Sequence, residues 1–430
     1  MELLFLFTFT LLYIVITHRH FERGVFLLFL LLPTYLIRFH LGSLPLTFLE
    51  IMVISLVNIH FLKNTKSFFQ FLQTFIRENK FFSTGIFLFL LGTTIGVFAS
   101  VDIKKALGEW RAFYIEPILL FFVLTHFFKT FHFHEQKEKI QTFILFPLIL
   151  CGTATTLLSI YQHFTGWLVP SSFWQNRATY RVTAWYGFPN AVGLFLAPLI
   201  PLSLSLFFET LHNRNKKTHR IIFIFSIIFI FTAPLALLFA KGSGPIIGAA
   251  AALAMLFLFY KKTRLPVIIL GLFSLILVFT SSHLYTIKQE LLARDYSGSL
   301  RRDIWSETIS LLKDHPFIGA GIASYEERIA PYRHNHTIEI FHHPHNIFLT
   351  IWVNTGIIGL IGFMLLLTQF FIQRVKKLNP QNIFIMCSLV VILVMGLVDS
   401  PYIKNDLAIL FWTILFLGNH VSGQKQNLYP

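Results

Sequence analysis

Apolar segments of about the length that crosses a lipid bilayer recur along the whole chain, and they restrict the fold more than any other feature. Because the hydrocarbon core offers no hydrogen-bond partner, such segments cross it as α-helices. The sequence contains thirteen of them, near residues 3–17, 24–39, 44–62, 81–99, 112–128, 142–162, 190–208, 221–240, 243–260, 265–282, 345–372, 383–399 and 404–418. Only 13% of the residues are charged, against roughly 25% in soluble proteins. We therefore expect an all-α, polytopic membrane bundle of 12–13 transmembrane helices.

The basic residues divide the loops between these segments into two sets. Alternate loops and the C-terminal tail hold 20 of the 35 lysines and arginines, and the opposite loops hold 15, of which seven lie in the stretch 284–344. The positive-inside rule places the richer set in the cytoplasm, so the loops 163–189 and 284–344 are expected on the outer side. The net charge of +15 is scattered over short loops. It therefore indicates topology and not nucleic-acid binding.

The chain shows no repeat of fixed period and no low-complexity linker, so we expect residues 1–430 to form a single integral membrane domain. Its large external loop is 284–344. Within this loop the pattern predicts an amphipathic helix near 300–314, with Ser299 as its cap and Pro316 just beyond its end. The residues expected on its inner side are Ile304, Trp305, Thr308, Ile309, Leu311 and Leu312.

Five histidines gather at the end of this loop: His334, His336, His342, His343 and His345. A zinc site is one interpretation, but the spacing matches no tetrahedral or catalytic zinc motif, and we expect no metal and no cofactor. A histidine with the ordinary pKa near 6.5 is instead suited to take a proton from a hydroxyl group at neutral pH.

Cationic side chains collect on the expected outer face. Arg177 and Arg181 lie in the loop 163–189, Lys241 lies in the short connection FAKGSGPIIGAA, and Arg301 and Arg302 lie in the large loop. Guanidinium groups match pairs of phosphate oxygens, so such a cluster suits a diphosphate. Contact with lipid headgroups is the alternative interpretation.

Four blocks of the chain, in this order, resemble the O-antigen ligase and polymerase superfamily over roughly residues 175–418. His345-Asn346, nine residues, and Gly356-Ile357-Ile358-Gly359 is similar to its His-Asn…Gly-x-x-Gly signature. The other blocks are RVTAWYGFPNAVGLFLAPLIPL, SLRRDIWSETISLLKDHPFIGAG and GLVDSPYIKNDLAILFWTILF. Ala240-Lys241-Gly242 stands where members often have Ser-Arg-Gly, which keeps the charge but loses bidentate phosphate contact.

The resemblance implies a GT-C-like, metal-independent membrane glycosyltransferase of the bacterial cytoplasmic (inner) membrane, with its active face periplasmic or extracellular. The donor would be a glycan on undecaprenyl diphosphate, and the acceptor a lipid, glycan or protein hydroxyl. Besides membrane lipids no other partner is implied, and no nucleic acid. His345 would be the general base and Arg301, four residues before Trp305, the preferred diphosphate contact in catalysis. The remaining residues expected to hold the diphosphate or glycan are Arg181, Lys241, Arg302, Arg177 and Asn346.

Two alternatives stay open. Within the superfamily, the motifs do not separate an O-antigen ligase from a surface polysaccharide polymerase or a protein O-oligosaccharyltransferase. From another class, a secondary transporter would explain the many helices and the intramembrane Glu50 and Glu116. A transporter has no need of a 61-residue outer loop that ends in His-Asn.

Overall fold

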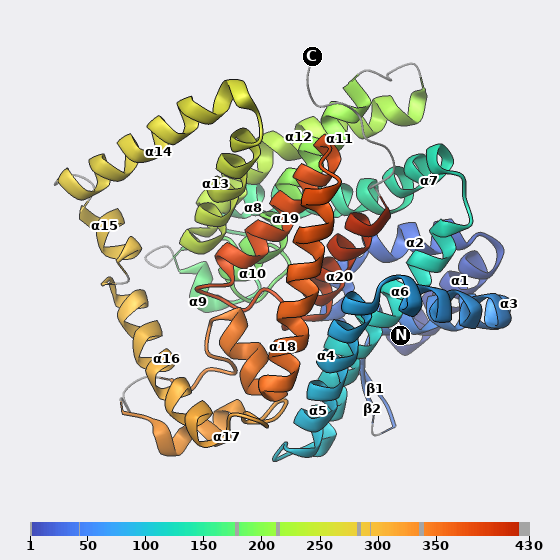
Figure 1. Cartoon of the computed structure of the whole chain (residues 1–430), viewed down its shortest axis with the longest axis horizontal. Coiled ribbons are helices and arrows are strands. Elements are labelled where there is room, and N and C mark those ends of the chain that lie inside the picture. The colour runs from blue at the N-terminus through green and yellow to red at the C-terminus, as the bar shows by residue number, and fades with distance from the viewer. Residues whose placement is uncertain are drawn as a thin grey trace.

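The computed structural model describes residues 2–42, 44–176, 180–211, 216–281, 285–292, 294–334 and 339–420, and most of them are helical (Figure 1). The helices are α1 Glu2–Arg19, α2 Phe21–Leu30, α3 Phe48–Glu78, α4 Lys80–Phe98, α5 Ile103–Glu109, α6 Glu116–Lys129, α7 Phe133–Ile140, α8 Phe146–Thr165, α9 Ser172–Gln175, α10 Pro189–Leu196, α11 Leu199–Leu211, α12 Lys217–Ala240, α13 Ser243–Leu258, α14 Lys261–Thr280, α15 Tyr285–Leu291, α16 Tyr296–Asp314, α17 Tyr325–Ile329, α18 Ile347–Lys376, α19 Pro380–Met395 and α20 Asn405–His420. A π-helical turn joins α5 to α6 and another joins α7 to α8. The strands β1 Arg38–Leu41 and β2 Leu44–Thr47 pair in an antiparallel hairpin.

Eight helical segments of the described residues are long and apolar enough to cross a membrane. They are Phe48–Glu78, Lys80–Phe98, Ile103–Lys129, Phe133–Thr165, Pro189–Leu211, Lys217–Ala240, Lys261–Thr280 and Ile347–Lys376. Shorter apolar helices lie at Leu6–Arg19, Ser243–Leu258 and Pro380–Met395. The prediction of an all-α, polytopic membrane bundle is confirmed. The number of 12–13 spans stays a prediction.

Glycines allow the closest helix contact in the bundle, between α4 and α18, which run side by side in Figure 1. A Cβ atom on Gly92 would lie 2.4 Å from the backbone nitrogen of Gly359, and one on Gly362 would lie 2.3 Å from that of Phe89. Small residues at such positions let two backbones approach closely, which is how membrane helices associate without a hydrophobic driving force. The second glycine of the Gly-x-x-Gly motif is therefore a packing residue.

The predicted helical segment 24–39 is wrong in its second half. Helix α2 ends at Leu30, a short 3₁₀-helix with Pro33 in its first turn follows, and the chain then enters the hairpin. Proline cannot donate the hydrogen bond that a continuing α-helix needs, and the turn of the hairpin uses Gly42 at φ 63°. Hydropathy alone did not reveal this break.

Helices α14 to α17 form an arm along one side of the bundle (Figure 1). Helix α14 buries none of its residues within the protein. Helix α16 begins earlier than the sequence predicted, since Asp295 and not Ser299 caps it through the N–H group of Gly298. Its inner side also differs: Ile309 is exposed, whereas Glu307 is buried.

Glu307 is buried because its carboxylate accepts a hydrogen bond of 2.7 Å from the backbone N–H group of His334. The neighbouring Thr308 hydroxyl bonds to that of Tyr325 on α17 at 2.7 Å. Polar groups thus join α16 to the loop that leads toward His345, and a simple apolar periodicity misses such a contact.

Candidate active site

Helix α18 begins at the histidine cluster, and Asn346 caps its first turn. The Oδ1 atom of Asn346 accepts hydrogen bonds from the backbone nitrogens of Phe348 at 3.0 Å and Leu349 at 3.2 Å. Its Nδ2 atom donates to the carbonyl oxygen of Leu397 at 3.0 Å. The asparagine of the His-Asn motif therefore connects the start of α18 to the residues just after α19.

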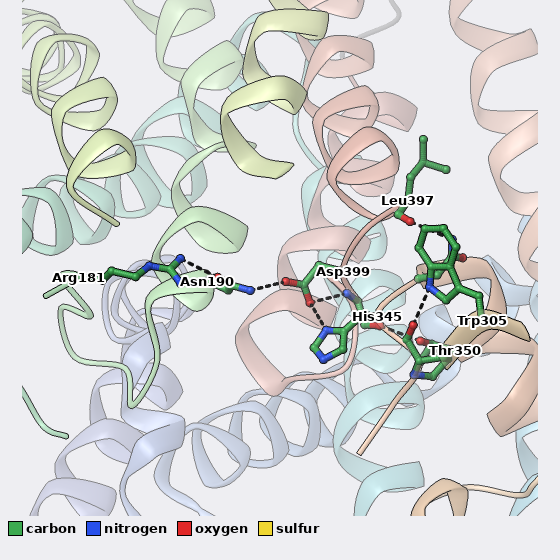
Figure 2. A network of polar contacts seen from close by, with 10 residues as sticks. Arg181, Asn190, Trp305, His345, Thr350, Leu397 and Asp399 are labelled. Atoms are coloured by element: carbon green, nitrogen blue, oxygen red, sulfur yellow. Dashed lines mark hydrogen bonds and ion pairs between the residues drawn. The ribbon is translucent and has the colours of Figure 1, made fainter. Parts of the chain in front are cut away.

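His345 directly precedes this cap and has a left-handed backbone, with φ 49°. Such a conformation is uncommon for a residue other than glycine, and strained residues of this kind tend to cluster at functional sites. The imidazole Nδ1 lies 3.3 Å from Oδ1 of Asp399, in the loop between α19 and α20 (Figure 2). Since Nδ1 faces the carboxylate, Nε2 is the ring nitrogen left for a substrate, and the side chain is 22% exposed.

A row of hydrogen bonds continues from Asp399 to the other loop of this face, as Figure 2 shows. Oδ2 of Asp399 accepts from Nδ2 of Asn190 at 3.0 Å, and Oδ1 of Asn190 accepts from Nη2 of Arg181 at 3.0 Å. Oδ1 of Asp399 also accepts from the backbone N–H group of Ser400 at 2.8 Å. This row of hydrogen bonds links Arg181 in the loop 163–189 to His345, the residue that follows the loop 284–344.

Burial and neighbouring charge set the protonation of this site. Burial alone would raise the pKa of Asp399, but the hydrogen bond with His345 and the nearby imidazoles outweigh it and lower the pKa to about 2. Burial lowers the pKa of His343 to about 3 and that of Lys404 to about 8. At neutral pH Asp399 is therefore a carboxylate, His343 is neutral, and Lys404 is mostly charged, with its ammonium 3.6 Å from the ring centre of Phe188.

Helix α16 reaches the site through Trp305. Its indole Nε1 donates to the carbonyl oxygen of Pro344 at 2.9 Å, directly before His345 (Figure 2). Arg301 lies one helical turn earlier, so it projects from the same face as Trp305. Arg302 points to a different side and is exposed. In the described residues neither arginine has an ion-pair or hydrogen-bond partner, which leaves both guanidinium groups for a ligand.

Arg181 donates hydrogen bonds to backbone carbonyl groups of the protein itself. Its Nε donates to the carbonyl oxygen of Ala240 at 2.7 Å and its Nη2 to that of Lys241 at 3.1 Å, so it satisfies the last carbonyls of α12. Lys241 has φ 52° and an exposed side chain. The contact to residue 241 is made by its backbone, so the architecture does not depend on whether lysine or arginine stands there. Arg177 lies outside the described residues.

The segment PFIGAG, residues 316–321, packs against a kink in α18. Gly356 interrupts that helix with φ 63° and ψ −177°. The N–H group of Ile357 donates to the carbonyl oxygen of Pro316 at 3.0 Å. A Cβ atom on Gly356 would lie 1.8 Å from the carbonyl oxygen of Phe317. The glycine pattern therefore holds the loop after α16 against α18.

The neighbouring histidines make different contacts from those of His345. His342 is exposed and forms an ion pair with Glu326. The ring of His343 lies 4.8 Å from that of His345, and its buried Nδ1 has no hydrogen-bond partner in the described chain. Where the structure describes the chain, no three side chains of His, Cys, Asp or Glu form a group that could hold a metal ion. His336 lies outside those residues.

The two intramembrane glutamates that suggested a transporter are both paired with Arg111. Its Nη2 lies 2.7 Å from Oε1 of Glu50 and its Nε lies 3.1 Å from Oε1 of Glu116. Glu50 also completes a capping box with Thr47 at the start of α3. A structural ion pair explains these carboxylates without ion coupling.

Sequence reasoning missed Asn190, Asp399 and Lys404 as members of this site. All three stood in blocks that carry the family resemblance, GFPN and VDSPYIK. An aspartate at the end of an apolar helix is costly unless it is paired, and this was the available signal.

Comparison with known proteins agrees with these features. The family model for O-antigen ligase matches residues 225–364, a range that includes Lys241, Arg301, the His-Asn pair and the Gly-x-x-Gly pair. A Haemophilus influenzae protein described as uncharacterized is 24% identical over 298 residues, which covers 63% of this chain and 67% of that protein. The resemblance seen in the motifs is thereby confirmed: residues 225–364 of this polytopic helical protein match the O-antigen ligase family.

Proposed function

We propose that the protein is a membrane glycosyltransferase that moves a glycan from undecaprenyl diphosphate to an acceptor hydroxyl outside the cytoplasmic membrane. The observation that carries the proposal is the pairing of His345 with Asp399 at the start of α18. The family match supports the reaction class, because the matched range contains the histidine and the cationic residues.

His345 acts as the general base in this proposal. Nε2 takes the proton of the acceptor hydroxyl, the hydroxyl oxygen attacks the anomeric carbon, and the bond from that carbon to the diphosphate breaks. The diphosphate leaves with the electron pair. Asp399 fixes the imidazole through Nδ1 and stabilises the imidazolium that forms, as an aspartate does beside the histidine of a catalytic triad.

The leaving diphosphate requires positive charge. Arg301 and Arg302 have free guanidinium groups on α16, Lys241 presents an exposed ammonium, and Lys404 lies among the residues around Asp399. Such groups stabilise charge that develops in the transition state. Arg181 and Asn346, which sequence reasoning assigned to substrate binding, are positioning residues in this scheme because backbone and side-chain partners already occupy them.

The position of the base fits a lipid-linked donor. His345 directly precedes α18, a helix long and apolar enough to cross a membrane, and the diphosphate of a polyprenyl lipid would meet water near such a helix end. The acceptor hydroxyl belongs to a lipid, a glycan or a protein. Ligase, polymerase and protein glycosylation use the same proposed chemistry.

Transfer of a labelled polyprenyl-linked glycan in membranes tests the proposal. His345→Ala should lower turnover by about 10²–10⁴-fold, the usual contribution of a positioned acid–base group. His342→Ala is the matched control, since that side chain is 84% exposed and it should lose little activity. Arg301→Ala should weaken donor binding as well as turnover, because a phosphate contact exists in the ground state.

The opposite pattern would refute this choice of base. If His345→Ala were active while an equally expressed His343→Ala were inactive, the neighbouring imidazole would be the one that carries the reaction.

A further inference from the structure

A polar cavity lies at the opposite end of the bundle from His345. His345 precedes the first residue of α18, whereas Arg374 is in its last turn. At about 1.5 Å per residue, a straight helix of 30 residues is roughly 45 Å long, so the two lie somewhat less than this apart because Gly356 kinks α18. The cavity measures about 460 Å³ and lies among the ends of α3, α6, α18 and α20. Its size is within the roughly 300–1,000 Å³ of ligand pockets.

The lining of this cavity is strongly cationic. Lys129, Arg374, Lys376 and Lys377 contribute four positive charges, and Glu78 is the carboxylate among the lining residues. Glu78 is itself 55% exposed and lies 4.0 Å from the ammonium of Lys129. Lys376 and Lys377 are exposed at the rim. The cavity therefore has an excess of positive charge that its own carboxylate does not offset.

Arg374 is unusual because it is a buried arginine without an ion-pair partner in the described chain. It is only 3% exposed. Its Nη2 donates to Oε1 of Gln373 at 3.0 Å and more distantly to Oδ1 of Asn419 at 3.4 Å. Its Nε and Nη1 atoms are buried without a hydrogen-bond partner, and no carboxylate of the described chain pairs with it. Buried guanidinium groups are normally paired, because the loss of hydration is otherwise uncompensated.

The guanidinium of Arg374 packs closely against α20 and the ring of Phe370. A Cβ atom on Gly418 would lie 2.5 Å from the ring of Phe370 and 3.1 Å from Nη1, so glycine at this position makes room for both side chains beside α20. The ring of Phe370 lies 5.8 Å away and offers only a partial cation–π contact. The unpaired nitrogens thus belong to a side chain that lines the cavity.

We propose that this cavity binds a phosphate group, with the Arg374 fork as its buried contact and Lys129, Lys376 and Lys377 as rim contacts. A guanidinium matches phosphate oxygens in a paired geometry, and the lysines supply less directional charge. Basic pockets between membrane helices are known to hold phospholipid headgroups. The phosphate comes either from an anionic lipid or from a soluble phosphate compound, and the site is separate from the proposed active site.

Thermal unfolding of the full-length protein in nanodiscs tests this inference. One set of nanodiscs contains phosphatidylcholine alone, another contains equimolar phosphatidylcholine and phosphatidylglycerol, and a third contains phosphatidylcholine with added inorganic phosphate. Sodium chloride keeps the ionic strength equal. The wild type should unfold at a higher temperature with phosphatidylglycerol or with phosphate than with phosphatidylcholine alone.

Arg374→Gln should remove this rise, with binding weakened by at least about tenfold through loss of a charge-assisted contact. Arg220→Gln is the matched control, because Arg220 is an exposed arginine at the start of α12 and does not line the cavity. Should Arg374→Gln fail to fold, the double variant Lys376→Gln and Lys377→Gln at the exposed rim should reduce the rise instead.

A rise with phosphatidylglycerol alone identifies a lipid headgroup, and a rise with inorganic phosphate as well identifies a site for soluble phosphate. The inference is overturned if neither probe changes the unfolding temperature of the wild type. It is equally overturned if the cavity variants respond as the Arg220→Gln protein does.

Discussion

The Asp399→Asn substitution tests the role of the negative charge that Asp399 places beside His345. Asparagine has nearly the same shape as aspartate and can still bond to Nδ1 of His345 and to Nδ2 or Oδ1 of Asn190. It removes the negative charge that would stabilise an imidazolium at His345. We therefore expect a protein that folds normally and transfers glycan slowly.

The geometry sets the size of this effect. At the observed 3.3 Å, two unit charges interact by about 1.3 kcal/mol in bulk water and by about 5 kcal/mol at an effective dielectric constant near 20. The asparagine keeps a hydrogen bond of roughly 1 kcal/mol. The Asp399 side chain is 10% exposed, so the charge–charge energy lies between the value for bulk water and the value for a dielectric constant near 20. A loss of about 3 kcal/mol corresponds to a turnover on the order of 10² lower.

The assay is glycan transfer in membranes at saturating donor, with expression checked by immunoblot. Asp303→Asn is the control, since it removes the same charge from an exposed position on α16. Asp399→Glu keeps the charge and should retain more activity than Asp399→Asn. If Asp399→Asn turned over as fast as the Asp303→Asn control, the carboxylate would have no part in the reaction.

The protonation of His343, the metal content and the topology each give a further expected outcome. His343 stays neutral in the folded protein down to about pH 3, whereas an unfolded histidine protonates below about 6.5, so the unfolded state binds more protons in this window and stability falls as pH falls. The unfolding temperature of His343→Gln should consequently decrease less than that of the wild type from neutral to mildly acidic pH, and an equal decrease would count against the buried neutral imidazole. Elemental analysis should find no stoichiometric zinc, and activity should survive a chelator; one zinc per chain, lost together with activity in His343→Ala, would reverse this view. Cysteines placed at the exposed Ser172 and Ser306 should both react with an impermeant reagent on intact cells, against a low background from the buried Cys151 and Cys387; labelling of one of them only after permeabilisation would show that the two loops lie on different sides.

Local signals predicted the membrane helices well. The segment expected at 345–372 corresponds to α18, Ile347–Lys376, because a long apolar run and an Asn cap are both encoded within a few neighbouring residues. The failure at 24–39 has the same origin, since Pro33 ends the helical geometry although the hydropathy continues. Hydropathy reports burial in lipid, whereas backbone geometry decides where a helix ends.

The site was only half predictable, because its contacts are not local. Motif spacing was enough to propose roles for His345 and Arg301. Asp399 meets His345 across 54 positions, and Asn190 meets Asp399 across 209. No periodicity within one helix indicates such pairs. The sequence also could not show that Arg181 is occupied by the carbonyls of α12, which depends on where that helix ends in space.

Two helices begin at this site. Their positive ends favour an anionic donor, and the carboxylate of Asp399 weakens this effect. Helix α18 starts just after His345 and α10 starts at Pro189, beside Asn190, so both positive helix ends lie here. The N-terminus of α10 has no side-chain cap, which leaves its first N–H groups for an anion or water. A carboxylate in such a place competes with an anionic donor for the same positive charge. Asp399 should thus weaken donor binding while it speeds transfer, and Asp399→Asn should bind the donor at least as tightly as the wild type. A variant that lost donor affinity and turnover together would show that Asp399 supports the fold of the site and not the proton transfer.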